Sequence, residues 1–238
     1  MGSEMCIRDR NYGVRRYGFH GTSHKYVAGK AIETLALDPE NNAIVTAHLG
    51  NGCSATAVLN GKSVDTSMGL TPLEGLMMGT RSGDLDPSIH QFLADQLNTD
   101  LEGVTDILNK KSGLLGVSGL SNDMRTLCEA EQNGDQQAKL AIDMFCYRLA
   151  KTIGSLAVPL GRIDALVFTG GIGENAAIIR ELTLARLNLL GFRIDPKLNS
   201  ENGESSNGRI TCSNSPIALV IATQEEWMIA QDTFVNVS

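Results

Sequence analysis

The stretch from Asp164 to Asn175 reads DALVFTGGIGEN, and it decides the class of fold. Residues 164–169 predict a buried strand, because they are mostly apolar and partly β-branched. A glycine-rich turn, Gly170–Asn175, follows at once and leads into a helix that we expect to continue through Leu190. Glycines let successive backbone N–H groups point into one concavity, and a helix N-terminus adds partial positive charge. The stretch therefore indicates an anion-binding turn after a central strand.

A second glycine cluster, His48–Gly52 (HLGNG), ends another predicted strand, Ala43–His48. Two more strands are predicted at 54–59 and 63–66. Asn60-Gly61 between them is a strong hairpin signal, because both turn positions need a positive φ. The three strands predict an antiparallel meander.

Two glycine clusters that each follow a buried strand could together bind the phosphate groups of a polyphosphate. Gly170–Asn175 lacks the second spacing of the Rossmann fingerprint, and no Gly-Lys-Ser or Gly-Lys-Thr of a P-loop follows it. Taken alone, either cluster fits a tight turn without a ligand about as well as it fits a phosphate site.

The rest of the chain alternates between predicted helices and strands, which indicates an α/β fold. A long helix follows Asn133-Gly134, carries one apolar stripe from Ala141 to Leu156, and is predicted to end at Pro159. The other elements are an irregular stretch over 67–86, helices over 87–97, 101–111 and 225–234, a polar loop over 199–208 and a strand over 218–222.

The composition excludes several classes of protein. The 238-residue chain has 20 Lys and Arg against 27 Asp and Glu, which gives a formal net charge of −7. We therefore expect neither nucleic acid nor a membrane surface as a partner. Five cysteines without a C-x-x-C pair favour a reducing cytoplasm over a disulfide framework. Residues 1–10 lack the hydrophobic core of a signal peptide, and we interpret them as a leader foreign to the fold.

Five segments in colinear order, from about Asn11 to the C-terminus, resemble the acetate kinase family. They are 16–24 (RYGFHGTSH), 47–52 (AHLGNG), 65–75 (DTSMGLTPLEG), 78–84 (MGTRSGD) and 168–175 (FTGGIGEN). The resemblance implies the actin-like, sugar-kinase-like ATPase fold with its ribonuclease H-like lobes. It also implies reversible in-line phosphoryl transfer from ATP to acetate, giving acetyl phosphate and ADP, with Mg²⁺ or Mn²⁺, in a homodimer.

Two residues match the family's transition-state stabilisers, Arg81 and His20. A guanidinium is always charged and can bond two phosphoryl oxygens at once. From the residues alone, an ion pair from Arg81 to Asp84 or Asp86 is slightly favoured. A histidine can donate to a phosphoryl group without permanent charge, although one that lies among aromatic residues is more often structural. His24 fits a supporting role at even odds.

The resemblance assigns the nucleotide to three segments. They are His48, Leu49, Gly50, Asn51 and Gly52 for the β- and γ-phosphates, Asp123, Met124 and Arg125 beside adenosine, and Gly171, Ile172, Gly173, Glu174 and Asn175 in the adenosine-side loop. Asn51 can donate as well as accept hydrogen bonds. Without the resemblance, residues 121–123 are a run of helix N-cap residues.

The family's magnesium-linked glutamate matches Glu225, and its small acyl pocket matches Phe19 and Pro72. Mg²⁺ takes one or two carboxylates together with phosphate oxygens and water. An acidic residue that starts a helix explains Glu225 about as well, and a core role is the alternative for Phe19 and Pro72.

The resemblance also predicts the domain organisation. Residues 11–224 would form the C-terminal nucleotide-binding lobe, and residues 225–238 a closing helix directed toward an N-terminal lobe that has no counterpart in this sequence. Two hypotheses follow: the chain acts as an acetate kinase, or it is a nucleotide-binding and dimerising lobe without turnover of its own. Propionate kinases share these motifs, so the choice of acyl chain stays open.

Overall fold

The computed structural model describes residues 11–237 of the chain. One five-stranded mixed sheet forms its centre, in the order β3-β2-β1-β4-β5. β1, β2 and β3 pair antiparallel, which confirms the meander, and β4 and β5 continue the sheet parallel to β1. The strands are β1 Ala43–Leu49, β2 Cys53–Leu59, β3 Lys62–Thr66, β4 Ala165–Thr169 and β5 Ile217–Val220.

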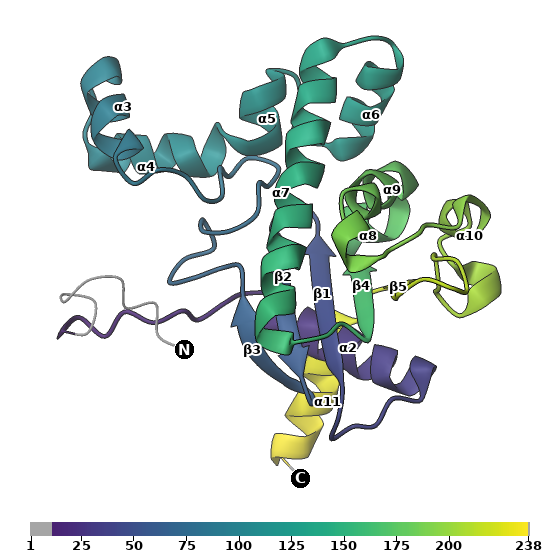
Figure 1. Cartoon of the computed structure of the whole chain (residues 1–238). Coiled ribbons are helices and arrows are strands. Elements are labelled where there is room, and N and C mark those ends of the chain that lie inside the picture. The colour runs from purple at the N-terminus through teal and green to yellow at the C-terminus, as the bar shows by residue number, and fades with distance from the viewer. Residues whose placement is uncertain (1–10, 238) are drawn as a thin grey trace.

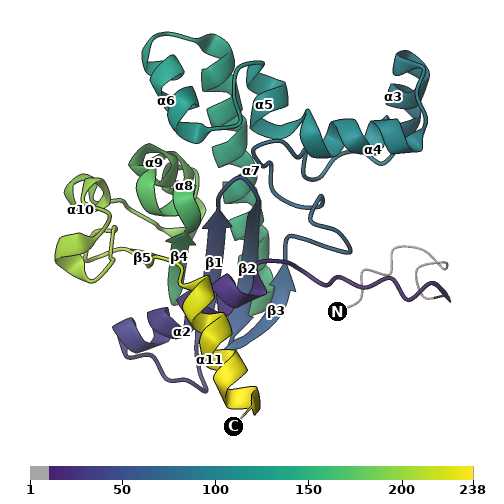
Figure 2. The ribbon, with the colours of Figure 1, turned by 180° about the vertical axis from the view of Figure 1, so that it is seen from behind.

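Helices cover both faces of this sheet (Figures 1 and 2). The long helix α7 (Gln136–Leu160) packs on one face, and α2 (Gly21–Leu35) packs on the other with α11 (Glu225–Val237) against it. Because side chains alternate along a strand, β1 supplies both cores: Val45 belongs to the core under α7, and Ile44 to the core under α2. β1 is therefore buried on both sides and fixes where its C-terminal end lies.

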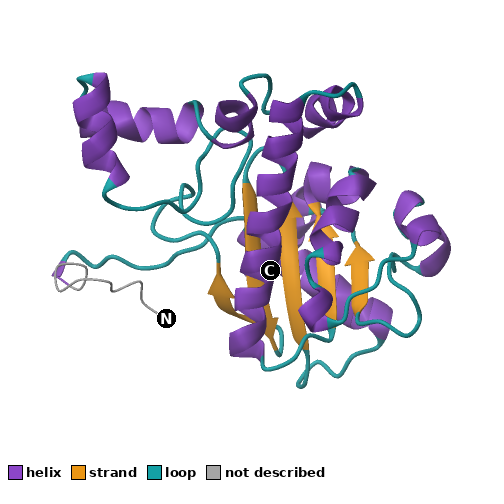
Figure 3. Ribbon diagram, turned by 45° about the horizontal axis from the view of Figure 1, so that its top comes forward, coloured by secondary structure: helices purple, strands orange, loops and turns teal. Residues whose placement is uncertain are grey.

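The remaining helices fall into two groups, and with the sheet they confirm the α/β class (Figure 3). Between β3 and α7 lie α3 Ile89–Leu97, α4 Leu101–Lys110, α5 Gly113–Ser118 and α6 Met124–Gln132. Between β4 and β5 lie α8 Gly170–Asn175, α9 Ala177–Ala185, the 3₁₀ turn η1 Asn188–Leu190, α10 Pro196–Ser200 and the 3₁₀ turn η2 Glu204–Ser206.

The predicted end of the long helix at Pro159 is wrong by one residue. Pro159 lies inside the last turn of α7, which runs to Leu160. Proline lacks only its own N–H, so the backbone after it still closes the turn: the Gly161 N–H donates to the Ala157 carbonyl at 3.0 Å. Gly161 then adopts φ 69°, the left-handed conformation that ends many helices.

Two further predictions about this region are wrong: the turn predicted at Gly170–Asn175 is itself a short helix, α8, and the helix predicted to continue through Leu190 ends at Ala185 as α9. The chain breaks between these two helices at Ala176. That residue adopts φ −100° and ψ 81°, which is not helical, and it separates α8 from α9. The polar loop predicted over 199–208 contains helical turns as well, namely the end of α10 and all of η2. No helix of the described residues is long and apolar enough to cross a membrane.

Candidate nucleotide and phosphoryl site

The two glycine clusters meet at one edge of the sheet. β1 and β4 run parallel with His48 opposite Thr169, so the turns after them leave from neighbouring strand ends. Gly170 adopts φ 76°, and a Cβ at this position would lie 2.8 Å from the Leu49 carbonyl oxygen. Only glycine tolerates both the backbone angle and this close approach. The absence of a side chain at Gly170 therefore allows the two turns to lie in contact.

A cavity of about 710 Å³ opens between these turns and the start of α6. Its size lies within the usual range of small-molecule and cofactor sites. It is lined by eight of the predicted nucleotide residues: Gly50, Asn51, Asp123, Met124, Arg125, Gly171, Ile172 and Asn175. The structure therefore brings together three segments that are far apart in the sequence.

Sequence reasoning missed seven further residues of the lining. They are Asn122, Cys128, Glu129, Gln132, Ala176, Ala177 and Ile178. Those on α6 follow Arg125 at spacings of three, four and seven, so the helical period could have found them. Those at 176–178 could not be found in this way, because they lie at the break between α8 and α9.

Five of the predicted nucleotide residues are absent from this lining: His48, Leu49, Gly52, Gly173 and Glu174. Leu49 is fully buried in the core. The Glu174 carboxylate accepts hydrogen bonds from the N–H groups of Gly170 at 2.9 Å and Thr223 at 3.1 Å. This carboxylate is directed at backbone donors, and it ties the turn to the segment that follows β5.

Asn51 is held through its oxygen atoms, while its Nδ2 group has no hydrogen-bond partner among residues 11–237. Its Oδ1 accepts a hydrogen bond from Asn122 Nδ2 at 3.0 Å, and its carbonyl accepts one from the Gly79 N–H at 3.0 Å. A Cβ at Gly79 would lie 2.1 Å from the same Oδ1, so any larger residue there would displace the Asn51 side chain from this position. The hydrogen bond to Oδ1 fixes the orientation of the amide. The Asn51 Nδ2 group, which is the donor of the amide, is then available to a phosphate.

Three histidines cluster beside the first glycine turn. The rings of His20 and His48 stack with centroids 4.3 Å apart, and His24 lies 6.5 Å from His20. The pKa of His20 is lowered to about 4, chiefly by burial and also by the nearby His48 and Arg81, against an opposing effect of Glu225. Burial also lowers the pKa of His48. The cluster is therefore neutral at pH 7.

His20 is positioned by an internal hydrogen-bond chain. Its Nδ1 lies 2.9 Å from Ser54 Oγ, and the same hydroxyl lies 2.7 Å from His24 Nε2. His24 Nδ1 in turn lies 2.7 Å from Thr46 Oγ1. Both ring nitrogens of the buried His24 are thus engaged, which favours its supporting role. No described residue is a partner of His20 Nε2, which leaves that nitrogen available to a ligand.

Arg81 has no carboxylate partner among the described residues, so the alternative of an ion pair is wrong. Its Nη1 donates instead to the Pro72 carbonyl at 3.0 Å and contacts Met78 Sδ at 3.4 Å. Asp84 accepts a hydrogen bond from the Gly75 N–H, and Asp86 accepts one from Ser88. The guanidinium is consequently held by neutral groups, and its charge is not compensated.

Arg81 and His20 share the space over Gly52. A Cβ at Gly52 would lie 3.4 Å from Arg81 Nη2 and 3.5 Å from His20 Cε1. The two predicted phosphoryl ligands therefore converge on one point at the rim of the first glycine turn. Gly52 does not line the cavity, but because it has no side chain it leaves space next to Arg81 and His20.

Glu225 is the half-buried first residue of α11. It lies near enough to raise the pKa of His20. The described residues contain no group of three or more His, Cys, Asp or Glu that could hold a metal ion. A single carboxylate fits a magnesium ion that draws its other ligands from nucleotide phosphates and water.

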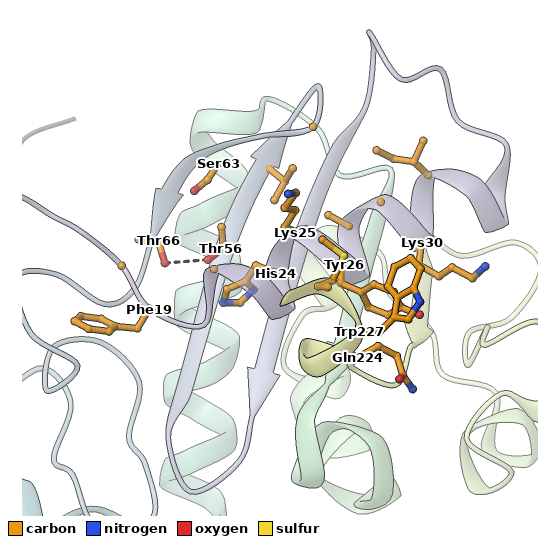
Figure 4. Close-up of a pocket in the computed structure, with 18 of the residues that line it drawn as sticks. Phe19, His24, Lys25, Tyr26, Lys30, Thr56, Ser63, Thr66, Gln224 and Trp227 are labelled. Carbon is orange, nitrogen blue, oxygen red and sulfur yellow. Dashed lines mark hydrogen bonds between the residues drawn. The ribbon is translucent and has the colours of Figure 1, made fainter. Parts of the chain in front are cut away.

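Phe19 and Pro72 are not brought into one pocket. Phe19 is 37% exposed and lines a separate cavity of about 840 Å³ with Gln224 and Trp227, and Pro72 is not part of that lining. Figure 4 shows the Phe19 ring apart from the packed rings of Tyr26 and Trp227, whose centroids are 5.9 Å apart. The acyl pocket at these two residues remains a prediction.

The sheet order, the two glycine turns and the nucleotide-sized cavity place this chain among the actin-like, sugar-kinase-like ATPases, as an α/β lobe of that class. The profile of the acetokinase family matches residues 7–231, and the chain belongs to that family.

Two curated relatives illustrate the match. Acetate kinase of Stutzerimonas stutzeri (strain A1501) is 55% identical over 224 residues, which cover 94% of this chain and 57% of the relative. Acetate kinase 1 of Neisseria meningitidis serogroup A / serotype 4A (strain DSM 15465 / Z2491) is 58% identical over 223 residues, covering 93% of this chain and 56% of the relative. The chain thus spans just over half the length of these relatives.

Two solved structures share the fold closely. Acetate kinase of Porphyromonas gingivalis superposes with a TM-score of 0.92 at 44% identity, over 100% of this chain and 60% of that one. A propionate kinase of Francisella tularensis subsp. tularensis SCHU S4 gives a TM-score of 0.90 at 49% identity, over 97% and 59%.

Proposed function

We propose that this chain carries the nucleotide- and phosphoryl-binding part of an acetate kinase, which transfers a phosphoryl group reversibly from ATP to acetate and gives ADP and acetyl phosphate. The observation that supports this most strongly is the uncompensated guanidinium of Arg81, which lies beside His20 over Gly52. Phosphoryl transfer spreads negative charge over the oxygens of the group in transit. A preorganised cation held by neutral partners stabilises that charge without a change of its own environment.

The phosphate chain would run from the cavity toward Arg81. Backbone N–H groups of the turn at 50–52 and the amide of Asn51 would bind the phosphates. His20 Nε2 would contact the phosphoryl group opposite Arg81, so that the pair fixes its position between donor and acceptor oxygens. Alignment and charge stabilisation are the contributions that this reaction needs most from a protein, because it needs little covalent chemistry from it.

A divalent ion, Mg²⁺ or Mn²⁺, would neutralise phosphate charge when it is bound with the nucleotide. Glu225 is the carboxylate that would hold it, together with phosphate oxygens. Its position at the N-terminus of α11, close to His20, supports this assignment.

Nucleotide binding by the chain can be tested by thermal unfolding with ADP or ATP and Mg²⁺. A ligand at about one hundred times its Kd stabilises the folded state by about 2.7 kcal/mol. We expect a rise in Tm with nucleotide, and Asn51→Ala should reduce this rise because it removes the Nδ2 donor at the cavity. No shift at millimolar nucleotide in the wild type would refute the nucleotide site.

Turnover can be tested by trapping acetyl phosphate as its hydroxamate. The relatives are longer than this chain, and the second hypothesis is a lobe that binds nucleotide and dimerises without turnover. Negligible hydroxamate with a clear nucleotide-dependent rise in Tm would support that hypothesis. Robust turnover would reject it, and Arg81→Ala should then abolish the turnover.

Propionate is the alternative acyl substrate, and the close structural match to a propionate kinase is the observation in its favour. The same assay with equal acetate and propionate gives the ratio of kcat/KM values. A ratio above one for acetate supports the acetate assignment. We further propose a cytoplasmic homodimer, and light scattering on the purified chain measures its mass directly.

A further inference from the structure

The break at Ala176 removes the helical hydrogen-bond partners of two backbone carbonyl groups. In an unbroken helix, the carbonyls of Gly173 and Glu174 would accept hydrogen bonds from N–H groups four residues later. The chain leaves the helical path at Ala176, so these two carbonyls lose those partners. Buried carbonyls without a partner are costly, and a break at this point must be supported from elsewhere.

Arg180, on α9, supplies that support. It is fully buried, and its Nη1 donates to both orphaned carbonyls, at 2.9 Å to Gly173 and 2.9 Å to Glu174. The other three donors also have partners: Nε donates to Asn199 Oδ1 at 2.8 Å, and Nη2 donates to the Asn199 carbonyl at 2.7 Å and to Asn202 Oδ1 at 2.6 Å. All five N–H groups of the guanidinium are thus bonded to neutral oxygens.

The two asparagines belong to the segment 196–208, which has no role in the site as described so far. Asn199 is 2% exposed, and its Nδ2 donates to the Ala177 carbonyl at 2.9 Å, one residue after the break. The far end of the segment is attached to the sheet, because the Val220 N–H donates to the Gly208 carbonyl at 2.8 Å. The segment therefore connects β5 to the back of the loop that lines the cavity.

Neither Arg180 nor the two asparagines line the cavity, whereas Gly171, Ile172 and residues 175–178 do. We propose that Arg180, Asn199 and Asn202 form a clasp of positioning residues, through which segment 196–208 holds the nucleotide loop 170–176 in its binding conformation. The proposal rests on the proposed function of that cavity as a nucleotide site.

Asn202→Gly tests the clasp with little disturbance to the backbone. Asn202 adopts φ 52°, which glycine accepts freely, so the variant loses the side-chain acceptor of one guanidinium bond and keeps the turn. Asn207→Gly is the matched control, because Asn207 has the same φ of 52° in the same segment, is exposed, and has no bond to Arg180. Arg180→Lys, which keeps the charge but not the fork, is the second test variant.

The first measurement is affinity at 20 °C, by calorimetric titration with Mg·ADP and separately with Mg·tripolyphosphate. We expect the Kd for ADP to rise in Asn202→Gly by up to about tenfold, the limit reached if the whole contribution of this hydrogen bond to a charged group is used to hold the loop. Tripolyphosphate would contact the turn at 50–52 and Arg81 but not the loop 170–176, so it should bind to Asn202→Gly as it does to the wild type. Asn207→Gly should behave as wild type with both ligands. An unchanged Kd for ADP in Asn202→Gly and Arg180→Lys would overturn the proposal.

The second measurement, amide hydrogen exchange without ligand, separates this proposal from the proposed function. We expect amides 171–176 to exchange faster in Asn202→Gly than in Asn207→Gly, while those of β1 keep their protection. If the wild type fails to bind ADP but this difference appears, the nucleotide assignment fails and the clasp stands. Equal exchange in the two variants would refute the clasp, whatever the wild type binds.

Discussion

Replacing Gly170 with alanine should destabilise the whole chain, because this one glycine lets the two turns touch. Its φ of 76° is in the left-handed region, and a Cβ would lie 2.8, 3.0 and 3.1 Å from the oxygen, nitrogen and carbon of Leu49. Leu49 is fully buried at the end of β1 and cannot move away without disturbing the sheet. The substitution therefore combines backbone strain with a clash against backbone.

The size of the effect follows from these two contributions. Alanine in the left-handed region costs about 1–2 kcal/mol. The clash with a fixed strand raises the loss to roughly 3 kcal/mol, within the range of severe single substitutions. With a urea m-value of about 3 kcal/mol per molar, at the upper end for small proteins, the midpoint of unfolding should fall by about 1 M.

Gly171→Ala is the control, because a Cβ at Gly171 has no atom within 4 Å and no positive φ is required there. Its urea midpoint should be unchanged, but its affinity for ADP should fall because Gly171 lines the cavity. Urea unfolding followed by circular dichroism, with ADP titrations on both variants, measures the contrast. If Gly170→Ala unfolds at the wild-type midpoint, the argument that the turns are held in contact by this glycine is refuted.

Three other predictions concern the histidines, Arg81 and Asn122. The folded-state pKa values of His20 and His24, about 4 and about 3, lie below the ordinary 6.5, so the unfolded chain binds more protons. Stability is then full above pH 6.5 and is lost as the pH falls toward those values, by roughly 1–2 kcal/mol per histidine at pH 5. Urea midpoints between pH 5 and 8 measure this loss, and a flat profile would contradict it; His24→Gln should flatten the slope. Arg81→Met should leave the urea midpoint within about 1 kcal/mol of wild type, because no ion pair is broken, and should weaken tripolyphosphate binding; equal binding would remove Arg81 from the phosphate path. Asn122→Ala frees Asn51 Oδ1 and should raise the Kd for ADP several-fold by letting the amide rotate, whereas an unchanged Kd would show that Asn51 needs no such support.

The fold was predictable where a local pattern determined it. The Asn60-Gly61 turn and the apolar runs of β1 and β4 are short-range signals, and the structure confirms them. The break at Ala176 has no such signal, because the residue is a good helix former. It is stabilised by Arg180, whose partners at 199 and 202 lie about twenty residues further along the chain. Tertiary contacts of this kind override local propensity.

The individual motifs of the site were predictable from the sequence, but their arrangement in space was less so. The glycine clusters predicted the two turns, and the helical spacing from Arg125 could have identified the cavity residues on α6. The sequence could not predict that Arg81 lacks a carboxylate partner, because Asp84 and Asp86 lie close by in the sequence. Only the structure shows that these two carboxylates accept hydrogen bonds from backbone N–H groups. The sequence likewise predicted that Glu174 contacts the nucleotide, whereas its carboxylate accepts hydrogen bonds from the backbone N–H groups of Gly170 and Thr223.

The parallel pairing of β1 with β4 has a consequence for the order in which the molecule assembles. Ala43 N–H donates to the Asp164 carboxylate across 121 positions of the chain, and the whole of α3 to α7 lies between these partners. Contacts so distant form late, because the intervening chain must first be brought together. The two turns consequently meet only when the sheet is nearly complete. A nucleotide should therefore slow unfolding while leaving the folding rate as it is, and its binding marks the completion of folding.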